Sequence, residues 1–384
     1  MNHLRFLNII IFLFLLLPAC KGQTVKNLEA DIQDIMARYR AVCASVVVVK
    51  DNRIIYTRSF GYNPNYNDTT LRMAIPSNGI YFIASISKSF ISTAIMQLVE
   101  KGKLKLDDDV NWYLDFRVQN PKYPDAPITV RMLMSHRSTI NDKHYGWNLN
   151  QINPEKGKKW QECYNDYKPG TRFSYCNLNY NLLGAIIEKV SGERFFDYID
   201  ENIMNPLELN ASYNLTKIDS TRLVKSLRYD SKKKKFRKDA FIYNYQYFEK
   251  QLKNYKLGDS TASFSPSGGV KISAVDLAKY MMMHINYGEY NGKRIISKAS
   301  ELEMWRPLAS DTTYALGFFR DKTILKGEPV VGVRGSSHGI HSIMLFNPDE
   351  KYGFVVICNG GIADRRMKEG IVLALYKHLI IKKD

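Results

Sequence analysis

The sequence predicts an α+β fold in which both chain ends build one antiparallel sheet, flanked by helices, with a mainly helical lobe inserted between them. Strand patterns gather near the two ends, whereas helical periodicity dominates from about 76 to 307. The chain has 384 residues, 45% of them hydrophobic, which is enough to bury one large or two ordinary domains. Such segments pack in layers around a shared core, and ligand sites commonly form in the cleft between two lobes.

The first nineteen residues have the pattern of a processing signal. Arg5 supplies a basic start, Phe6 to Leu17 is almost wholly apolar, and Leu17-Pro18-Ala19-Cys20 resembles a bacterial lipoprotein cleavage site. We expect 1–19 to be a signal peptide, Cys20 to carry the lipid, and 20–27 to form a tether to an outer or inner membrane of the cell envelope. An uncleaved anchor is disfavoured because the apolar run is shorter than the roughly 20 residues that cross a bilayer.

The folded domain is expected over 28–384 and begins with an amphipathic helix around Leu28 to Tyr39. Two strand patterns follow, Ala44 to Lys50 and Arg53 to Ser59. The dipeptide Asp51-Asn52 between them is a tight-turn signal, so the pair reads as a β hairpin.

The inserted lobe and the C-terminal quarter carry further helix and strand signals. Ser273 with Asp276 resembles a capping box for a helix over Ala274 to Tyr287, and a last amphipathic helix is expected from about Arg365 to Ile380. Strands are predicted at Tyr314–Phe319, Val330–Val333, Ser342–Phe346 and Phe354–Cys358.

The other four cysteines, Cys43, Cys163, Cys176 and Cys358, are too few and too scattered for a disulfide scaffold or a zinc site. Cys43 and Cys358 both lie at the ends of predicted strands and could pair in an oxidising envelope. Two buried, inert thiols are the favoured interpretation. Cys176 is expected to pack rather than to react.

The formal net charge of +17 raises the question of a polyanionic partner. The densest basic run is Lys232 to Lys235 with Arg237 and Lys238, and a solvated loop is the default interpretation of such a run. Anionic envelope components are natural partners for an exported basic protein. Nothing in the chain resembles a nucleic-acid-binding fold, so no nucleic acid partner is expected.

The tetrapeptide Ser85-Ile86-Ser87-Lys88 carries the chemistry. Residues i and i+3 share one face of a helix, so the Ser85 hydroxyl and the Lys88 amine can meet. An unprotonated lysine can take the serine proton as the oxygen attacks a carbonyl. The same pattern recurs at Ser231 to Lys234, in a charged stretch without periodicity, and we interpret that match as chance.

Several ordered segments from about Val42 to Leu379 together resemble the serine beta-lactamase and penicillin-binding protein superfamily, nearest to its class C and DD-peptidase-like branch. The resemblance implies the corresponding fold, in which the nucleophile's helix borders a cleft. The segments are Ala84 to Lys88, Gln97 to Leu104, Ile128 to Val130, Leu133 to His136, Pro169 to Thr171, Tyr175 to Asn177, Pro206-Leu207, Ser267 to Gly269 and Asp276 to Ala278.

In that family a Tyr-x-Asn element forms the second wall of the site, and Tyr175-Cys176-Asn177 is the only such element among 25 tyrosines. The resemblance implies that Tyr175 relays protons with Lys88, whose charge favours the phenolate. It also implies that Asn177 accepts from Lys88 and donates to a substrate carbonyl. An ordinary buried tyrosine is the less favoured alternative.

The third family element departs from the pattern. Relatives carry Lys-Thr-Gly or His-x-Gly on a strand beside the cleft, where Val333-Arg334-Gly335 stands here. Val333 lacks the cation that helps to bind a substrate carboxylate, and Arg334 should point to the other side of the strand. Gly335 permits close backbone approach to substrate, and the backbone N–H groups of Ser85 and Ser336 are expected to form the oxyanion hole.

Three histidines and one threonine near these segments need an interpretation. His338 and His341, three residues apart on a strand, should face opposite sides, so a shared metal is disfavoured and neither is assigned a catalytic role. His136 is expected to be structural, with a hydrogen bond inside its own turn. Thr139 replaces the glycine that usually follows Ser138, which should change a loop near the second lobe.

The resemblance implies a cell-envelope serine hydrolase that forms an acyl-enzyme on amide or ester substrates. The candidates are peptidoglycan peptides, other D-amino-acid peptides, small esters and beta-lactams, and no cofactor or metal is expected. Val333 and Thr139 motivate an alternative, a non-catalytic binding protein that retains the fold. A third interpretation is a structural lipoprotein that contacts anionic cell wall through its basic surface.

Overall fold

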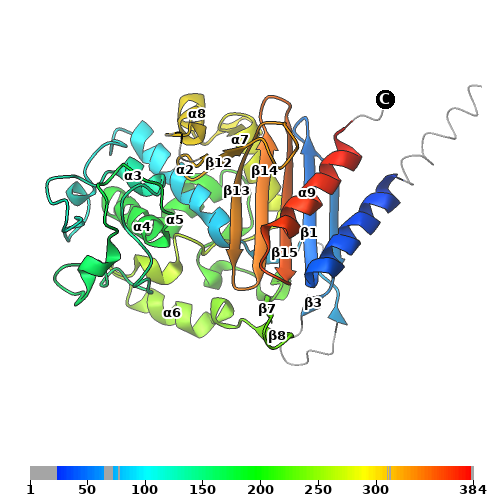
Figure 1. Ribbon diagram of the computed structural model, residues 1–384, viewed down its shortest axis with the longest axis horizontal. Coiled ribbons are helices and arrows are strands. Elements are labelled where there is room, and N and C mark those ends of the chain that lie inside the picture. The colour runs from blue at the N-terminus through cyan, green and yellow to red at the C-terminus, as the bar shows by residue number, and fades with distance from the viewer. Residues whose placement is uncertain (1–23, 65–71, 77, 309, 311–312, 382–384) are drawn as a thin grey trace, which may run out of the picture.

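Figure 1 shows the computed structural model, which describes residues 24–64, 72–76, 78–308, 310 and 313–381. The expected signal peptide and Cys20 lie outside these residues. Residues 24–39 form the first helix, which begins inside the segment expected as a tether. No helix in the described part of the chain combines the length and the apolar character that a membrane span requires.

The fold is α+β, and its main sheet is antiparallel and drawn from both chain ends, as predicted. Six strands follow the order β12-β13-β14-β15-β1-β2, so β1 from the N-terminal part lies beside β15 from the C-terminal part (Figure 1). The strands of this sheet are β1 (Ala41–Lys50), β2 (Arg53–Gly61), β12 (Phe319–Asp321), β13 (Val330–Ser337), β14 (Ile340–Asn347) and β15 (Tyr352–Gly360).

Helices cover the two faces of the sheet. The helix 24–39 and α9 (Arg365–Leu379) lie on one face (Figure 1), where Val46 and Val48 of β1 join their apolar cluster. Val47 and Val49 of the same strand belong to the cluster of the helical lobe on the opposite face. This alternation with period two is what a strand buried on both faces requires.

The same alternation determines whether the two strand cysteines, Cys43 and Cys358, can form a disulfide. Cys358 on β15 lies opposite Ala44 and joins the cluster under α9, whereas Cys43 joins the cluster of the helical lobe. Their side chains therefore point to opposite faces of the sheet, and both thiols are free. Burial raises the pKa of each thiol to about 12, which fits the inert interpretation rather than the disulfide.

The inserted lobe is mainly helical in the described residues, and Ser273 caps α7 as predicted, because its Oγ accepts from the N–H of Asp276 at 3.0 Å. The predicted strand Tyr314–Phe319 is wrong. The backbone folds there into a turn in which Ala315 N donates to Phe318 O at 2.7 Å, and β12 begins only at Phe319. The helices are α2 (Ser87–Glu100), α3 (Val130–Met134), α4 (Asn177–Ser191), α5 (Phe195–Ile199), α6 (Tyr245–Lys253), α7 (Ala274–Ile285) and α8 (Lys298–Trp305).

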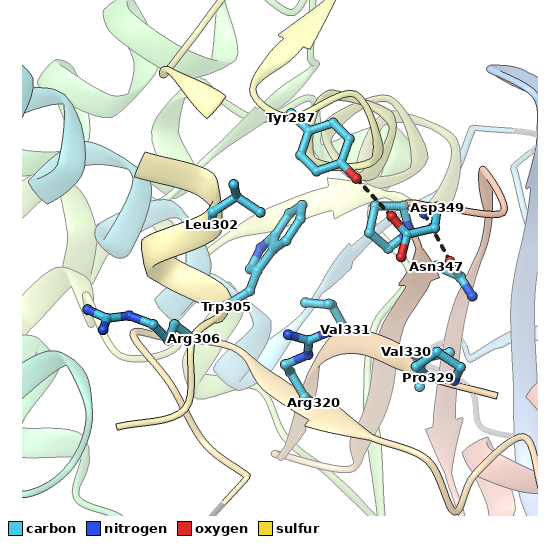
Figure 2. A pocket seen from close by; sticks show the side chains of 11 residues that line it. Tyr287, Leu302, Trp305, Arg306, Arg320, Pro329, Val330, Val331, Asn347 and Asp349 are labelled. Carbon is cyan, nitrogen blue, oxygen red and sulfur yellow. Dashed lines mark hydrogen bonds between the residues drawn. The ribbon is translucent and has the colours of Figure 1, made fainter. Parts of the chain in front are cut away.

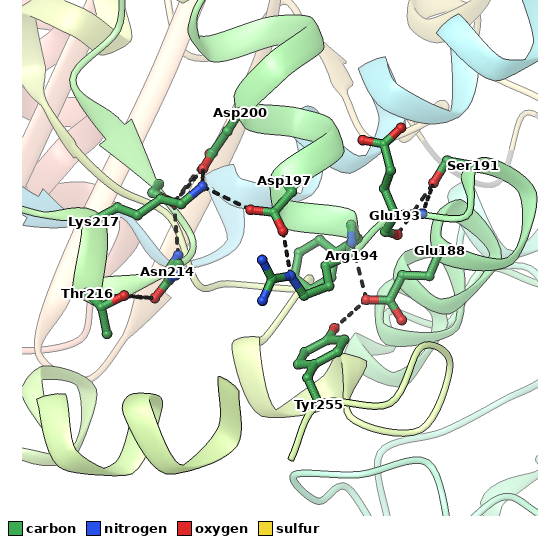
Figure 3. Close-up of polar contacts among 12 residues, drawn as sticks. Glu188, Ser191, Glu193, Arg194, Asp197, Asp200, Asn214, Thr216, Lys217 and Tyr255 are labelled. Carbon is green, nitrogen blue, oxygen red and sulfur yellow. Dashed lines mark hydrogen bonds and ion pairs between the residues drawn. The ribbon is translucent and has the colours of Figure 1, made fainter. Parts of the chain in front are cut away.

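Buried carboxylates tie the loops of the helical lobe to its helices (Figure 3). Glu188, near the end of α4, accepts from the N–H of Gly258 at 2.7 Å and from Thr261 Oγ1 at 2.5 Å. Asp200 accepts from Lys217 Nζ at 2.8 Å, although burial raises the pKa of Asp200 to about 6. The Glu188 contacts fix the end of α4, whose first residue, Asn177, belongs to the candidate site.

Candidate active site

Ser85 lies in a tight 3-10 turn, η1 (Ala84–Ile86), that leads directly into α2. Ala84 has φ of 52°, in the left-handed region that residues with a side chain seldom occupy. The hydroxyl of Ser87 holds this conformation, because it donates to the Ala84 carbonyl at 2.7 Å and accepts from the N–H of Val270 at 3.0 Å. The turn therefore presents Ser85 in a fixed position at the start of the helix.

Lys88 is fully buried, and its Nζ has three contacts. It lies 3.0 Å from Ser85 Oγ, 2.8 Å from Asn177 Oδ1 and 2.7 Å from the carbonyl oxygen of Ser267. The last two atoms can only accept hydrogen bonds, so they take two of the amine hydrogens. The third position on the nitrogen then faces Ser85, as a hydrogen when Lys88 is charged and as a lone pair when it is neutral.

Asp142 fixes Asn177 in the orientation that Lys88 needs. The carboxylate Oδ2 accepts from both the backbone N–H and the side-chain Nδ2 of Asn177, each at 2.8 Å, and Oδ1 accepts from the N–H of Leu178 at 3.0 Å. Because the amide nitrogen is bound to Asp142, the amide oxygen must face Lys88. One hydrogen of Nδ2 is left for a substrate, in keeping with the expected role of Asn177.

Tyr175 lies beside Lys88 with 43% of its surface exposed. The Lys88 Nζ is 5.0 Å from the centre of its ring, within cation–π range. The Tyr175 hydroxyl makes no hydrogen bond to any described residue, so the expected relay to Ser85 is not already formed. The three predicted catalytic side chains therefore share one site, with the phenol in contact through its ring.

His136 packs against the ring of Tyr175. Its ring centre lies 4.3 Å from that of Tyr175, and its Nδ1 accepts from the N–H of Cys176 at 3.2 Å. Burial holds the pKa of His136 well below its usual value, so the ring is neutral. The His136 side chain is bonded to the Tyr-Cys-Asn segment, and its backbone N–H donates to Leu133 O at 3.2 Å within the turn, as expected. Thr139 has φ of 72°, and its Oγ1 accepts from Asn120 Nδ2 at 2.9 Å.

Gly335 allows β13 to approach the nucleophile's turn. A Cβ on Gly335 would lie 2.4 Å from the Ile83 carbonyl oxygen and from Ser342 Oγ, a separation too short for any side chain. Ser342 Oγ also donates to that Ile83 oxygen at 2.8 Å, which joins the sheet to the turn. The glycine thus serves contact with the protein's own backbone, and it places Ser336 beside Ser85.

Val333 and Arg334, the two residues before Gly335, point to opposite faces of the sheet, as predicted. Val333 is buried in the cluster of the helical lobe. Arg334 lies on the α9 side, where its Nε is 3.0 Å from Glu369 Oε1 and its guanidinium stands 3.9 Å over the ring of Phe319.

Two adjoining cavities meet at Ser85, Tyr175 and Ser336. The His338 cavity, of about 240 Å³, also includes Tyr145, Trp147, Asn177 and Ser267. The Lys368 cavity, of about 440 Å³, also includes Phe173, Thr313, Tyr314, Val333, Arg334 and Gly335. Ser85 is therefore reachable from both cavities.

His338 and His341 have different hydrogen-bond partners. His338 lines the cavity named after it, and its Nδ1 lies 2.9 Å from Asp239 Oδ2. His341 Nδ1 lies 2.8 Å from Ser336 Oγ, and burial lowers the pKa of His341 to about 4. Among the described residues, no group of three or more histidine, cysteine or acidic side chains is placed to hold a metal ion.

A further pocket, of about 250 Å³, lies away from this site, between α8 and the strand ends at Val330 and Asn347 (Figure 2). Trp305, Arg320 and Tyr287 line it, and none of the predicted site residues does.

A profile of the family described as Beta-lactamase matches residues 28–376, nearly the whole domain that holds this site. The chain belongs to the beta-lactamase family. As a member of that family it resembles the octameric penicillin-binding protein homologue from Pyrococcus abyssi, with a TM-score of 0.71 and 27% identity over 92% of this chain and 76% of the other. These findings confirm the resemblance drawn from the sequence and support the expectation of a serine hydrolase.

Curated relatives match this beta-lactamase-family chain at similar identity. Protein flp of Staphylococcus aureus (strain MRSA252) is 25% identical over 324 residues, which cover 82% of this chain. The chain thus spans only 59% of the length of flp. N-acetylmuramyl-L-alanine amidase of Bacillus subtilis (strain 168) is 26% identical over 315 residues, which are 72% of this chain and 67% of the amidase.

Sequence reasoning missed several residues of the site. Ser267 lay in a family segment that could have marked it, although its contribution is a backbone carbonyl. Asp142 follows no spacing rule, because it reaches Asn177 across 35 positions of sequence. The exposed rings of Tyr145 and Trp147 likewise carry no local pattern.

Replacing Asp142 tests whether Asn177 is held as described. Asp142→Ala is expected to lower the unfolding free energy by about 1–3 kcal/mol, because three N–H donors and the Cys176 thiol lose their acceptor. It should also slow covalent labelling of Ser85 by a fluorophosphonate about tenfold, since the Asn177 oxygen is no longer directed at Lys88. Thermal melting and labelling rates measure both effects, with the exposed neighbour Lys143→Ala as control. Labelling at the wild-type rate in Asp142→Ala would contradict the assignment.

Proposed function

We propose that the protein is a serine hydrolase that cleaves amide or ester bonds through an acyl-enzyme on Ser85. One observation carries the proposal: two acceptor-only partners orient Lys88 so that its third position faces Ser85 Oγ at 3.0 Å. A neutral Lys88 in this arrangement presents its lone pair to the serine hydroxyl, which is the geometry of a general base.

In the reaction, Ser85 Oγ attacks the substrate carbonyl carbon while its proton passes to Lys88 Nζ. The negative charge that develops on the carbonyl oxygen faces the N–H groups of Ser85 and Ser336. The leaving nitrogen or oxygen takes a proton from Lys88 or Tyr175, and the acyl group stays on Ser85. Water, deprotonated by the same pair, then attacks the ester and restores the serine.

Wall peptides in the cell envelope are the substrate class that we favour within this proposal. The Bacillus relative is named an N-acetylmuramyl-L-alanine amidase, and the Pyrococcus structure is a penicillin-binding protein homologue. The basic run from Lys232 to Lys235 lies exposed in the hairpin of β7 (Leu227–Asp230) and β8 (Lys235–Lys238), where it can contact anionic wall polymer.

The rival, a binding protein that retains the fold, predicts a folded chain that no acylating reagent modifies. Fluorophosphonate labelling of Ser85 is expected in the wild type and absent in Ser85→Ala, because the hydroxyl that faces Lys88 is lost. Ser231→Ala is the matched control, since Ser231 to Lys234 repeats the spacing in the exposed turn between β7 and β8. Intact-protein mass spectrometry measures the adduct. A folded wild type that stays unlabelled would favour the binding protein.

We also propose lipid attachment at Cys20, on the strength of Leu17-Pro18-Ala19-Cys20 after an apolar run. Expressed in a bacterium, the wild type should incorporate a labelled fatty acid and fractionate with membranes. Cys20→Ser should do neither, because the thiol that carries the lipid is gone. Equal labelling of both proteins would refute the attachment site.

A further inference from the structure

The peptide between Gly335 and Ser336 has a charged partner at one end. Lys368, near the start of α9, donates from Nζ to the Gly335 carbonyl oxygen at 2.9 Å. The same peptide unit carries the N–H of Ser336, the expected oxyanion donor. The described residues contain no cis peptide bond, so this C=O and this N–H point in opposite directions. Lys368 therefore binds one end of a dipole whose other end faces the reacting carbonyl.

Lys368 is a buried cation without a carboxylate of its own. Its residue surface is 4% exposed, and no acidic group of the described residues lies within ion-pair distance of it. Glu369, whose charge acts on Lys368, is paired with Arg334 instead. Burying a charged lysine costs free energy, so a polar group that binds the ammonium is expected beside it. The Gly335 carbonyl is the acceptor that Lys368 reaches.

We propose that Lys368 is a positioning residue for the oxyanion hole: its ammonium polarises the Gly335–Ser336 peptide and holds the Ser336 N–H toward the cleft. The inference rests on the proposed hydrolase function. A cation at the carbonyl oxygen draws electron density from the peptide, which strengthens the N–H at the other end, as in any chain of hydrogen bonds. The stabilisation acts on the tetrahedral intermediate, so it should appear in the acylation rate constant rather than in substrate binding.

The proton of Lys368 makes the effect dependent on pH. Burial, with a smaller contribution from Arg334, lowers the pKa of Lys368 to about 8. The other groups that face it are His341 on β14, with a pKa lowered to about 4 by burial, and Cys358 on β15, with a pKa raised to about 12. Both stay uncharged near pH 8, and Glu369 is bonded to Arg334. The polarisation is therefore present at neutral pH and is lost as the pH rises through about 8.

The full-length protein and an activated ester, such as p-nitrophenyl acetate, provide the test. Lys368→Met is expected to lower the acylation rate constant about tenfold with little change in KM, less than the roughly 100- to 1000-fold cost of deleting an oxyanion donor. Lys368→Arg, which keeps the charge, should recover most of the rate. Lys377→Met, an exposed lysine on the same helix, is the matched control.

The pH profile is the second readout. The wild-type acylation rate should fall above about pH 8, and this limb should be missing in Lys368→Met. The proposal would be overturned if Lys368→Met acylates at the wild-type rate. It would also be overturned if the variant only raises KM for substrates that carry a carboxylate, because Lys368 would then be a substrate-binding cation. If Lys368→Met does not fold, the wild-type protein still provides a test. A wild-type acylation rate that does not fall above about pH 8 would by itself overturn the proposal. Wild-type Ser85 that no fluorophosphonate labels would instead refute the hydrolase function.

Discussion

The site depends on where the hydrogens of one buried amine can go. Lys88 is sealed from water, so its nitrogen must be satisfied by protein atoms, and three separate parts of the chain supply them. A turn before α2 brings Ser85, the start of α4 brings Asn177, and the loop before β9 (Lys271–Ser273) brings Ser267. If any one of them moved, a buried polar group would lose its partner, which is costly enough to define the geometry.

The rest of the fold keeps these three parts in place. Asp142 orients the amide of Asn177, while Glu188 binds the far end of α4 to the loop at Gly258. On the other side, the missing side chain of Gly335 lets the sheet edge reach the nucleophile's turn. The edge of the sheet therefore reaches the turn of Ser85 at Gly335, beside the two cavities that share Ser85.

Local patterns predicted most of the fold and the centre of the site. Strands buried on both faces and a serine followed by a lysine one turn later are short-range signals, so β1, β14, β15 and the Ser85–Lys88 contact were predicted. Tyr314–Phe319 was misread because apolar residues that form a packed turn have the same composition as a strand. Asp142 and Lys368 act only through contacts between distant segments, which no spacing in the sequence reveals.

The lost cation at Val333 changes what the third element contributes. Gly335 and Ser336 still bring the strand backbone beside Ser85. The cations that line the adjoining cavity are Lys368 of α9 and Arg334, which is paired with Glu369. In the proposed mechanism the site uses main-chain donors and Lys88 in place of a charged side chain on the strand.

A crystal structure of the protein after reaction with a fluorophosphonate examines the central claim most directly. We predict an adduct on Ser85 Oγ, with the Lys88 amine still within hydrogen-bond distance of Ser85, Asn177 and the Ser267 carbonyl. An adduct on any other residue, or a Lys88 side chain turned away from Ser85, would contradict it.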